Sequence, residues 1–108
     1  TLLYMRLWFP PDQAGKIAKR FMDWVKDNPA DPSIVKSLGM GVTTDDNGMI
    51  LGVSLSEIMR GKEKEVLEFA AKQNLFMAAG IAGYKYKNEI IFDTPEAFKL
   101  LGMTPPEQ

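Results

Sequence analysis

Three stretches of the chain carry the residue pattern of β-strands. The first, residues 2–9, is apolar or aromatic on both of its alternating sides. It stops at Pro10-Pro11, since proline cannot donate to a strand ladder. The second and third, at about 35–45 and 48–55, flank Asn47-Gly48, a dipeptide that supplies the two positive φ angles of a type I′ turn. The pattern therefore predicts one strand and, later in the chain, a hairpin.

Two longer stretches carry apolar residues at the three- and four-residue spacing of an α-helix. The first is predicted to begin at an N-cap, Asp12, and to end near Asn28. The second is predicted to begin at Ser54 or Ser56 and to end near Gly80. The two apolar stripes consist of Ala14, Ile17, Ala18, Phe21, Met22 and Val25, and of Val66, Phe69, Ala70, Gln73 and Met77. Each stripe can bury one side of its helix against a sheet.

The C-terminal part contains one further strand region and a short helix. Residues 80–92 are expected to hold either one bulged strand or a short hairpin. Thr94 is the predicted N-cap of the helix, Pro95 is its first residue, and Gly102 follows its end. Residues 103–108 are expected to be a tail.

The resulting order, β-α-β-β-α-β, predicts an α+β fold of the ferredoxin-like type. In this fold one antiparallel four-stranded sheet carries both helices on the same face. Residues 1–108 are expected to form one domain, because a chain of 108 residues has room for one core.

The two faces of the predicted sheet differ in character, since successive side chains of a strand point to opposite sides. The face assigned to the helices carries Leu3, Met5, Leu7, Phe9, Leu38, Met40, Val42, Met49, Leu51, Val53 and Leu55. The opposite face carries Tyr4, Arg6, Trp8, Ser37, Gly39, Gly41, Thr43, Ile50, Gly52 and Ser54. Glycine weakens a strand by about 0.5–1 kcal/mol relative to alanine, so a group that approaches closely is expected to compensate.

A sheet that is open to water on one side normally has a polar outer face, and this one does not. We therefore expect a second sheet, supplied by a twin subunit, to pack about 10 Å away. The alternative is that the glycines only permit curvature and that Tyr4 and Trp8 lie across them in a monomer.

Composition removes several kinds of chemistry. The sequence has no cysteine and no histidine, which excludes thiolate nucleophiles, cysteine or imidazole metal ligands and serine–histidine triads. A net charge of −1 argues against a nucleic-acid binder. No apolar run is long enough to cross a membrane and no leader is recognisable, so a cytoplasmic protein without a membrane function is expected. No metal or organic cofactor is assigned.

The element order, the 108-residue length, the apolar second sheet face and the short helix after the last strand resemble the dimeric α/β-barrel superfamily of ferredoxin-like proteins. This group includes cofactor-free monooxygenases, haem-degrading monooxygenases, small isomerases and decarboxylases. In such dimers the two sheets face each other, and ligands lie between a sheet face and the helices or in a pocket lined by the sheet. The resemblance implies an uncharacterised member with this fold and a homodimer formed through the sheet face. Haem degradation ranks low, because it generally depends on a histidine ligand.

Six polar or aromatic residues are candidates for binding a ligand. Arginine can orient a carboxylate or enolate, tyrosine can donate to a developing oxyanion, and tryptophan can wall off an apolar pocket. The candidates are Tyr4, Arg6, Trp8, Ser54, Tyr84 and Tyr86. These residue types are also enriched at protein–protein interfaces, so they could instead hold a dimer together.

The sequence thus favours a homodimer that binds a small apolar or aromatic molecule without a cofactor. Two alternatives stay open. The first is a cofactor-independent enzyme of the monooxygenase or isomerase type, and the second is a purely structural dimer.

Overall fold

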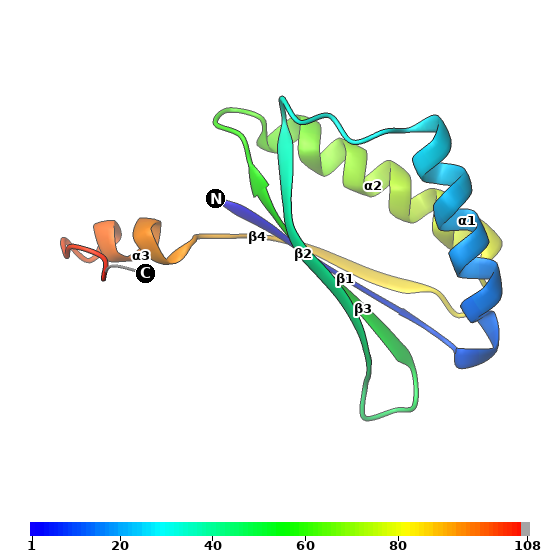
Figure 1. Ribbon diagram of the computed structural model, residues 1–108. Helices are drawn as coiled ribbons and strands as arrows, with labels where there is room; N and C mark the ends of the chain where they lie inside the picture. The colour runs from blue at the N-terminus through cyan, green and yellow to red at the C-terminus, as the bar shows by residue number, and fades with distance from the viewer. Residues whose placement is uncertain (107–108) are drawn as a thin grey trace.

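The computed structural model in Figure 1 describes residues 1–106. Its elements in chain order are β1 (Leu2–Phe9), η1 (Pro11–Gln13), α1 (Ala14–Asp27), β2 (Val35–Thr44), β3 (Ile50–Ile58), α2 (Glu63–Gly80), β4 (Lys85–Ile91) and α3 (Thr94–Leu100). The four strands form one sheet in the order β2-β3-β1-β4, and every neighbouring pair is antiparallel. Helices α1 and α2 cover one face of the sheet, while α3 lies beyond the end of β4 (Figure 1). This arrangement confirms the ferredoxin-like α+β fold.

Pairing with the central strand β1 explains two differences from the prediction. β1 pairs with β3 along its whole length, from Leu2 opposite Glu57 to Phe9 opposite Ile50. Because β1 offers partners that far, β3 continues past Ser54 and Ser56, and α2 begins only at Glu63. On its other side β1 pairs continuously with β4, which is one strand and not a hairpin. Of the predicted tail, residues 107–108 lie outside the described part.

The hairpin turn is not of type I′. Among residues 1–106 only glycines have a positive φ, and in this turn that residue is Gly48 at +78°. The Asp45 carboxylate accepts hydrogen bonds from the backbone N–H groups of Asn47 and Met49, both at 2.9 Å. The loop therefore needs glycine at one position and is closed by an aspartate side chain.

Two predicted helix caps also differ. Asp12 lies in η1, and no side chain caps α1. At α3 the N-cap is Asp93, one residue before Thr94. The Asp93 carboxylate accepts from the Glu96 backbone N–H at 2.8 Å, and the Glu96 carboxylate accepts from the Asp93 N–H at 3.0 Å. This reciprocal pair is a capping box, which satisfies two backbone donors at once.

The register of β3 reverses its predicted faces. Directly paired residues of antiparallel strands share a face. Gly52 pairs with Leu7 and Ser54 pairs with Met5, so Gly52 and Ser54 face the helices. The residues Leu51, Val53 and Leu55 pair with Trp8, Arg6 and Tyr4 and lie on the face opposite the helices, here called the open face. The prediction was wrong for β3 because a shift of one residue moves every side chain to the other side.

The assignment of β2 was correct except near its bulge. Gly39 and Gly41 pair with Leu55 and Val53, which places both glycines on the open face. A register shift between Ser37 and Gly39 places Ser37 opposite Ser56 and therefore on the helix side. Bulges of this kind insert an extra residue and re-aim the neighbouring side chains.

The buried core is divided between the two ends of the helix–sheet layer. One cluster contains Leu3, Ile58, Val66 and Ala70, and the other contains Phe9, Ile17, Met77 and Ile81. The middle of β1, at Met5 and Leu7, is only half-buried. Within residues 1–106 there is no helix with both the length and the apolarity needed to cross a membrane.

Candidate functional site

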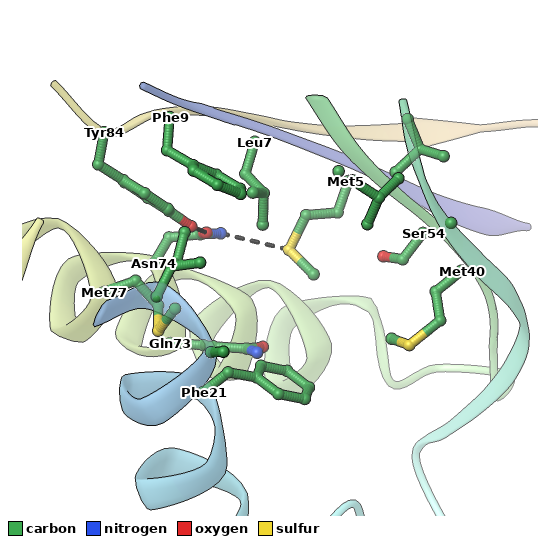
Figure 2. Close-up of a pocket in the computed structure, with 16 residues that line it drawn as sticks. Met5, Leu7, Phe9, Phe21, Met40, Ser54, Gln73, Asn74, Met77 and Tyr84 are labelled. Atoms are coloured by element: carbon green, nitrogen blue, oxygen red, sulfur yellow. Dashed lines mark hydrogen bonds between the residues drawn. The ribbon is translucent and has the colours of Figure 1, made fainter. Parts of the chain in front are cut away.

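A cavity of about 340 Å³ lies between the sheet and the two helices, at the middle of β1. Figure 2 shows side chains from β1, β2, β3, α1 and α2 around it. Its wall consists of Met5, Leu7, Phe9, Ile17, Ala18, Phe21, Met40, Gly41, Val42, Gly52, Val53, Ser54, Gln73, Asn74, Met77 and Tyr84. Met40 and Val42 are 69% and 74% exposed, so the cavity opens to solvent along β2.

Two small residues of β3 lie in the wall of this cavity. Gly52 and Ser54 stand opposite Leu7 and Met5 on the helix side of the sheet. A β-carbon on Gly52 would lie only 3.1 Å from Cδ1 of Leu7, so the absence of a side chain lets Leu7 occupy that position. A second cavity of about 200 Å³ shares Met5, Phe21, Met40, Ser54 and Gln73 with the first.

The two helices contact each other beyond the cavity. Trp24 of α1 packs edge-on against Phe69 of α2, with ring centroids 5.8 Å apart, and lies 5.5 Å from the ring of Phe76. The Arg20 guanidinium lies 4.0 Å from the centroid of Phe76 and donates from Nε to its carbonyl oxygen at 3.1 Å. These contacts fix α1 on α2 without filling the space above β1.

Asn74 lines the cavity and is a candidate residue that the sequence did not single out. It is 1% exposed and is the buried polar residue of the described chain. On α2 it follows Val66 and Ala70 at four-residue spacing and precedes Met77 by three. That spacing places an amide in the middle of the apolar stripe, and this signal could have identified it, although the predicted stripe contained the neighbouring Gln73 instead.

Asn74 links α2 to β4 and to Tyr84, the residue just before β4, through hydrogen bonds. Its Nδ2 donates to the Ala70 carbonyl oxygen at 3.0 Å and to Oδ1 of Asn88, on β4, at 3.2 Å. The Tyr84 hydroxyl donates to Oδ1 of Asn74 at 2.6 Å. Burial raises the pKa of the Tyr84 phenol above its ordinary value, and Tyr86 adds a smaller contribution. Tyr84 is therefore a neutral hydroxyl group at neutral pH.

The open face carries a different arrangement. The Arg6 guanidinium lies 4.9 Å from the ring centroid of Tyr4 and 5.7 Å from that of Trp8, and it forms an ion pair with Glu89. Lys87 Nζ lies 3.8 Å from the same carboxylate. Because Glu89 already neutralises Arg6, this arginine is poorly suited to hold a ligand carboxylate.

The sheet separates the six predicted site residues into two groups. Tyr4, Arg6 and Trp8 lie on the open face, whereas Ser54 and Tyr84 line the cavity on the helix side. Tyr86 pairs with Leu7 and so lies on the helix side, but it is 40% exposed and is not part of the cavity wall. The candidates therefore do not form one site.

No protein-family model matches this chain, and no curated protein sequence matches it. The solved structures that are similar to this chain include the following two. The C-terminal domain of the MgtC protein from Mycobacterium tuberculosis gives a TM-score of 0.48 at 9% identity, over 82% of this chain and 86% of that chain. A "putative antibiotic biosynthesis monooxygenase" from Caulobacter crescentus gives a TM-score of 0.45 at 17% identity. The match covers 85% of this chain and 90% of that chain. The chain is a ferredoxin-like α+β domain, an assignment that its own strand order and connections support.

Proposed function

We propose that this protein binds a small, largely apolar molecule, without a metal or organic cofactor, in the cavity between its sheet and helices. The observation that carries the proposal is the cavity itself, about 340 Å³ with a mostly apolar wall. Pockets for small ligands typically measure about 300–1,000 Å³ and combine an apolar wall with a few polar groups. Here the polar groups are Ser54, Gln73, Asn74 and Tyr84.

The arrangement supports binding better than catalysis. Ser54 projects from the sheet and Gln73 from α2, and both lie apart from the Tyr84–Asn74 pair (Figure 2). Within the described chain, Tyr84 is the one ionisable side chain of the wall, and its raised pKa keeps it protonated at neutral pH. A general acid–base function works best with a pKa near the operating pH.

The open face supports the homodimer that forms part of this proposal. Between residues 1 and 106 no helix covers this face (Figure 1). It carries Tyr4, Trp8, Leu51, Val53 and Leu55. A β-carbon placed on Gly39 or Gly41 would meet no atom within 4 Å, so a strip beside these side chains is free to receive a second copy of the sheet. Two apolar sheet faces of this kind pack about 10 Å apart.

Titration with naphthalene, followed by 1H–15N correlation spectra, tests ligand binding. The largest shifts are expected at the amide signals of Gly52 and Asn74. Ser54→Leu places a larger side chain in the cavity and is expected to weaken binding at least tenfold. Thr44→Leu is the matched control, because Thr44 also lies on the helix side but not in the cavity wall. If Ser54→Leu binds naphthalene as tightly as the unaltered protein does, the ligand does not bind in this cavity.

A further inference from the structure

The orientation of the Asn74 amide follows from one contact. Its Nδ2 lies 3.0 Å from the carbonyl oxygen of Ala70. A carbonyl oxygen can only accept, so the amide atom at this position must be the nitrogen, and the oxygen must face Tyr84. Asn74 is 1% exposed, so the partners of its amide in the folded protein are the neighbouring protein groups named here.

This orientation fixes the direction of the hydrogen bond to tyrosine. Oδ1 of Asn74 cannot donate, so the 2.6 Å contact requires the Tyr84 hydroxyl to give its single proton to the amide. The phenolic oxygen then has only lone pairs to offer to another molecule. Turning the hydroxyl away would leave a buried amide oxygen without a partner, which is unfavourable.

The amide nitrogen offers no donor in return. Three acceptors surround its two hydrogens: the Ala70 carbonyl oxygen at 3.0 Å, Oδ1 of Asn88 at 3.2 Å and Sδ of Met5 at 3.3 Å. The Tyr84 end of the cavity is therefore a hydrogen-bond acceptor. In addition, the wall formed by described residues contains no charged side chain, so an ionised ligand would lack a counter-charge.

We propose that the cavity selects an uncharged ligand whose apolar frame carries a hydrogen-bond donor, such as the hydroxyl of a phenol or an alcohol, and that this donor binds the Tyr84 oxygen. The inference rests on the proposed function, because it names the chemical class that the same cavity would take. It adds the direction of one hydrogen bond: at Tyr84 the ligand donates and the phenolic oxygen accepts.

Four two-ring probes of similar size test this polarity by calorimetric titration at neutral pH. They are 2-naphthol, which can donate, 2-methoxynaphthalene, which can only accept, naphthalene, which can do neither, and the anion 2-naphthoate. A neutral hydrogen bond contributes about 0.5–1.5 kcal/mol, so 2-naphthol is expected to bind about threefold to tenfold more tightly than 2-methoxynaphthalene. No binding of 2-naphthoate is expected.

Two tyrosine variants assign the effect to one oxygen. Tyr84→Phe is expected to remove the preference for 2-naphthol over 2-methoxynaphthalene while naphthalene still binds. Tyr86→Phe is the matched control: Tyr86 lies two residues further along, in β4 and outside the cavity wall, and its variant is expected to keep the preference. If Tyr84→Phe does not fold, the ranking of the four probes with the unaltered protein still tests whether the cavity prefers a hydrogen-bond donor.

The outcomes separate the two proposals. If naphthalene binds and 2-naphthol is not preferred, or 2-naphthoate binds most tightly, the acceptor polarity is wrong and the cavity remains a binding site. If no probe binds, the proposed function is wrong and the inference fails with it.

Discussion

The two faces of the sheet are both apolar, but they are built in different ways. On the helix side, β3 presents the small residues Gly52 and Ser54, and the helices rest on two end clusters, so a cavity remains between them. On the open face, Tyr4 and Trp8 lie close to the guanidinium of Arg6, which is paired with Glu89. The difference shows that the apolar character of a sheet face does not by itself indicate what binds to it. What matters is whether the face leaves a hollow for a small molecule or a surface for another sheet.

The largest expected effect is on the open face. Trp8→Asp places a charge where the proposed dimer excludes water, which is strongly unfavourable. We expect light scattering to give about 24 kDa for the unaltered protein, twice the 12.1 kDa of the chain, and a monomer for the variant. Tyr86→Asp, an equivalent change on the exposed helix side of β4, is the control and should stay dimeric. A dimeric, stable Trp8→Asp protein would show that the interface lies elsewhere.

On the helix side, the largest loss of stability is expected from Asn74→Leu. Leucine has a similar volume, but it leaves the Tyr84 hydroxyl and the Asn88 amide oxygen without their shared partner. The free energy of unfolding in urea is expected to fall by about 1–3 kcal/mol. Gln73→Leu, at the half-buried neighbouring position, is the control and should change it much less. Equal effects of the two variants would show that the network adds no stability.

A smaller effect is expected from Gly52→Ala. Its β-carbon would lie 3.1 Å from Leu7 Cδ1, so Leu7 must move, and a loss of about 1 kcal/mol is expected in urea unfolding. Gly15→Ala, in α1 with nothing within 4 Å of the added carbon, is expected to stabilise the protein by about 1 kcal/mol. The same sign for both substitutions would contradict the close packing of Gly52 on Leu7.

The smallest effect appears only at alkaline pH. Because burial raises the pKa of Tyr84, the folded state holds the phenolic proton more tightly than the unfolded state, whose tyrosine ionises near pH 10. The stability from this group is complete below about pH 10 and is lost as the pH rises further towards the pKa of the folded state. The free energy of unfolding should therefore fall less steeply between pH 9 and about pH 11 in Tyr84→Phe than in the unaltered protein. Parallel curves would mean that Tyr84 is not held as a buried neutral donor.

The sequence predicted those parts of the fold that depend on neighbouring residues along the chain. Proline at positions 10 and 11 ends β1, the apolar spacing from Ile17 to Val25 matches α1, and Gly102 follows α3. Each of these features depends only on residues that are close together in the sequence. Packing against distant segments therefore does not change where these elements begin or end. The element order followed from them, and with it the ferredoxin-like fold.

The candidate site was predicted only in part, because its residues come from distant segments. Ser54 and Tyr84 line the cavity as candidates should, but Asn74 was missed, since an amide within an apolar stripe is recognised only when its partners are known. Arg6 looked available for a ligand until the fold placed Glu89 beside it. A sequence shows that a charged side chain is present, but it does not show which opposite charge will lie beside it in the folded protein.

By itself, then, the sequence determined the order of the helices and strands, the fold class and the two apolar sides of the first strand. Only the tertiary structure decided which side of the sheet each residue of β3 faces, because strand alternation has a period of two and a one-residue shift exchanges the faces. That choice placed Gly52 and Ser54 under the helices, where both lie in the wall of the cavity and Gly52 makes room for Leu7.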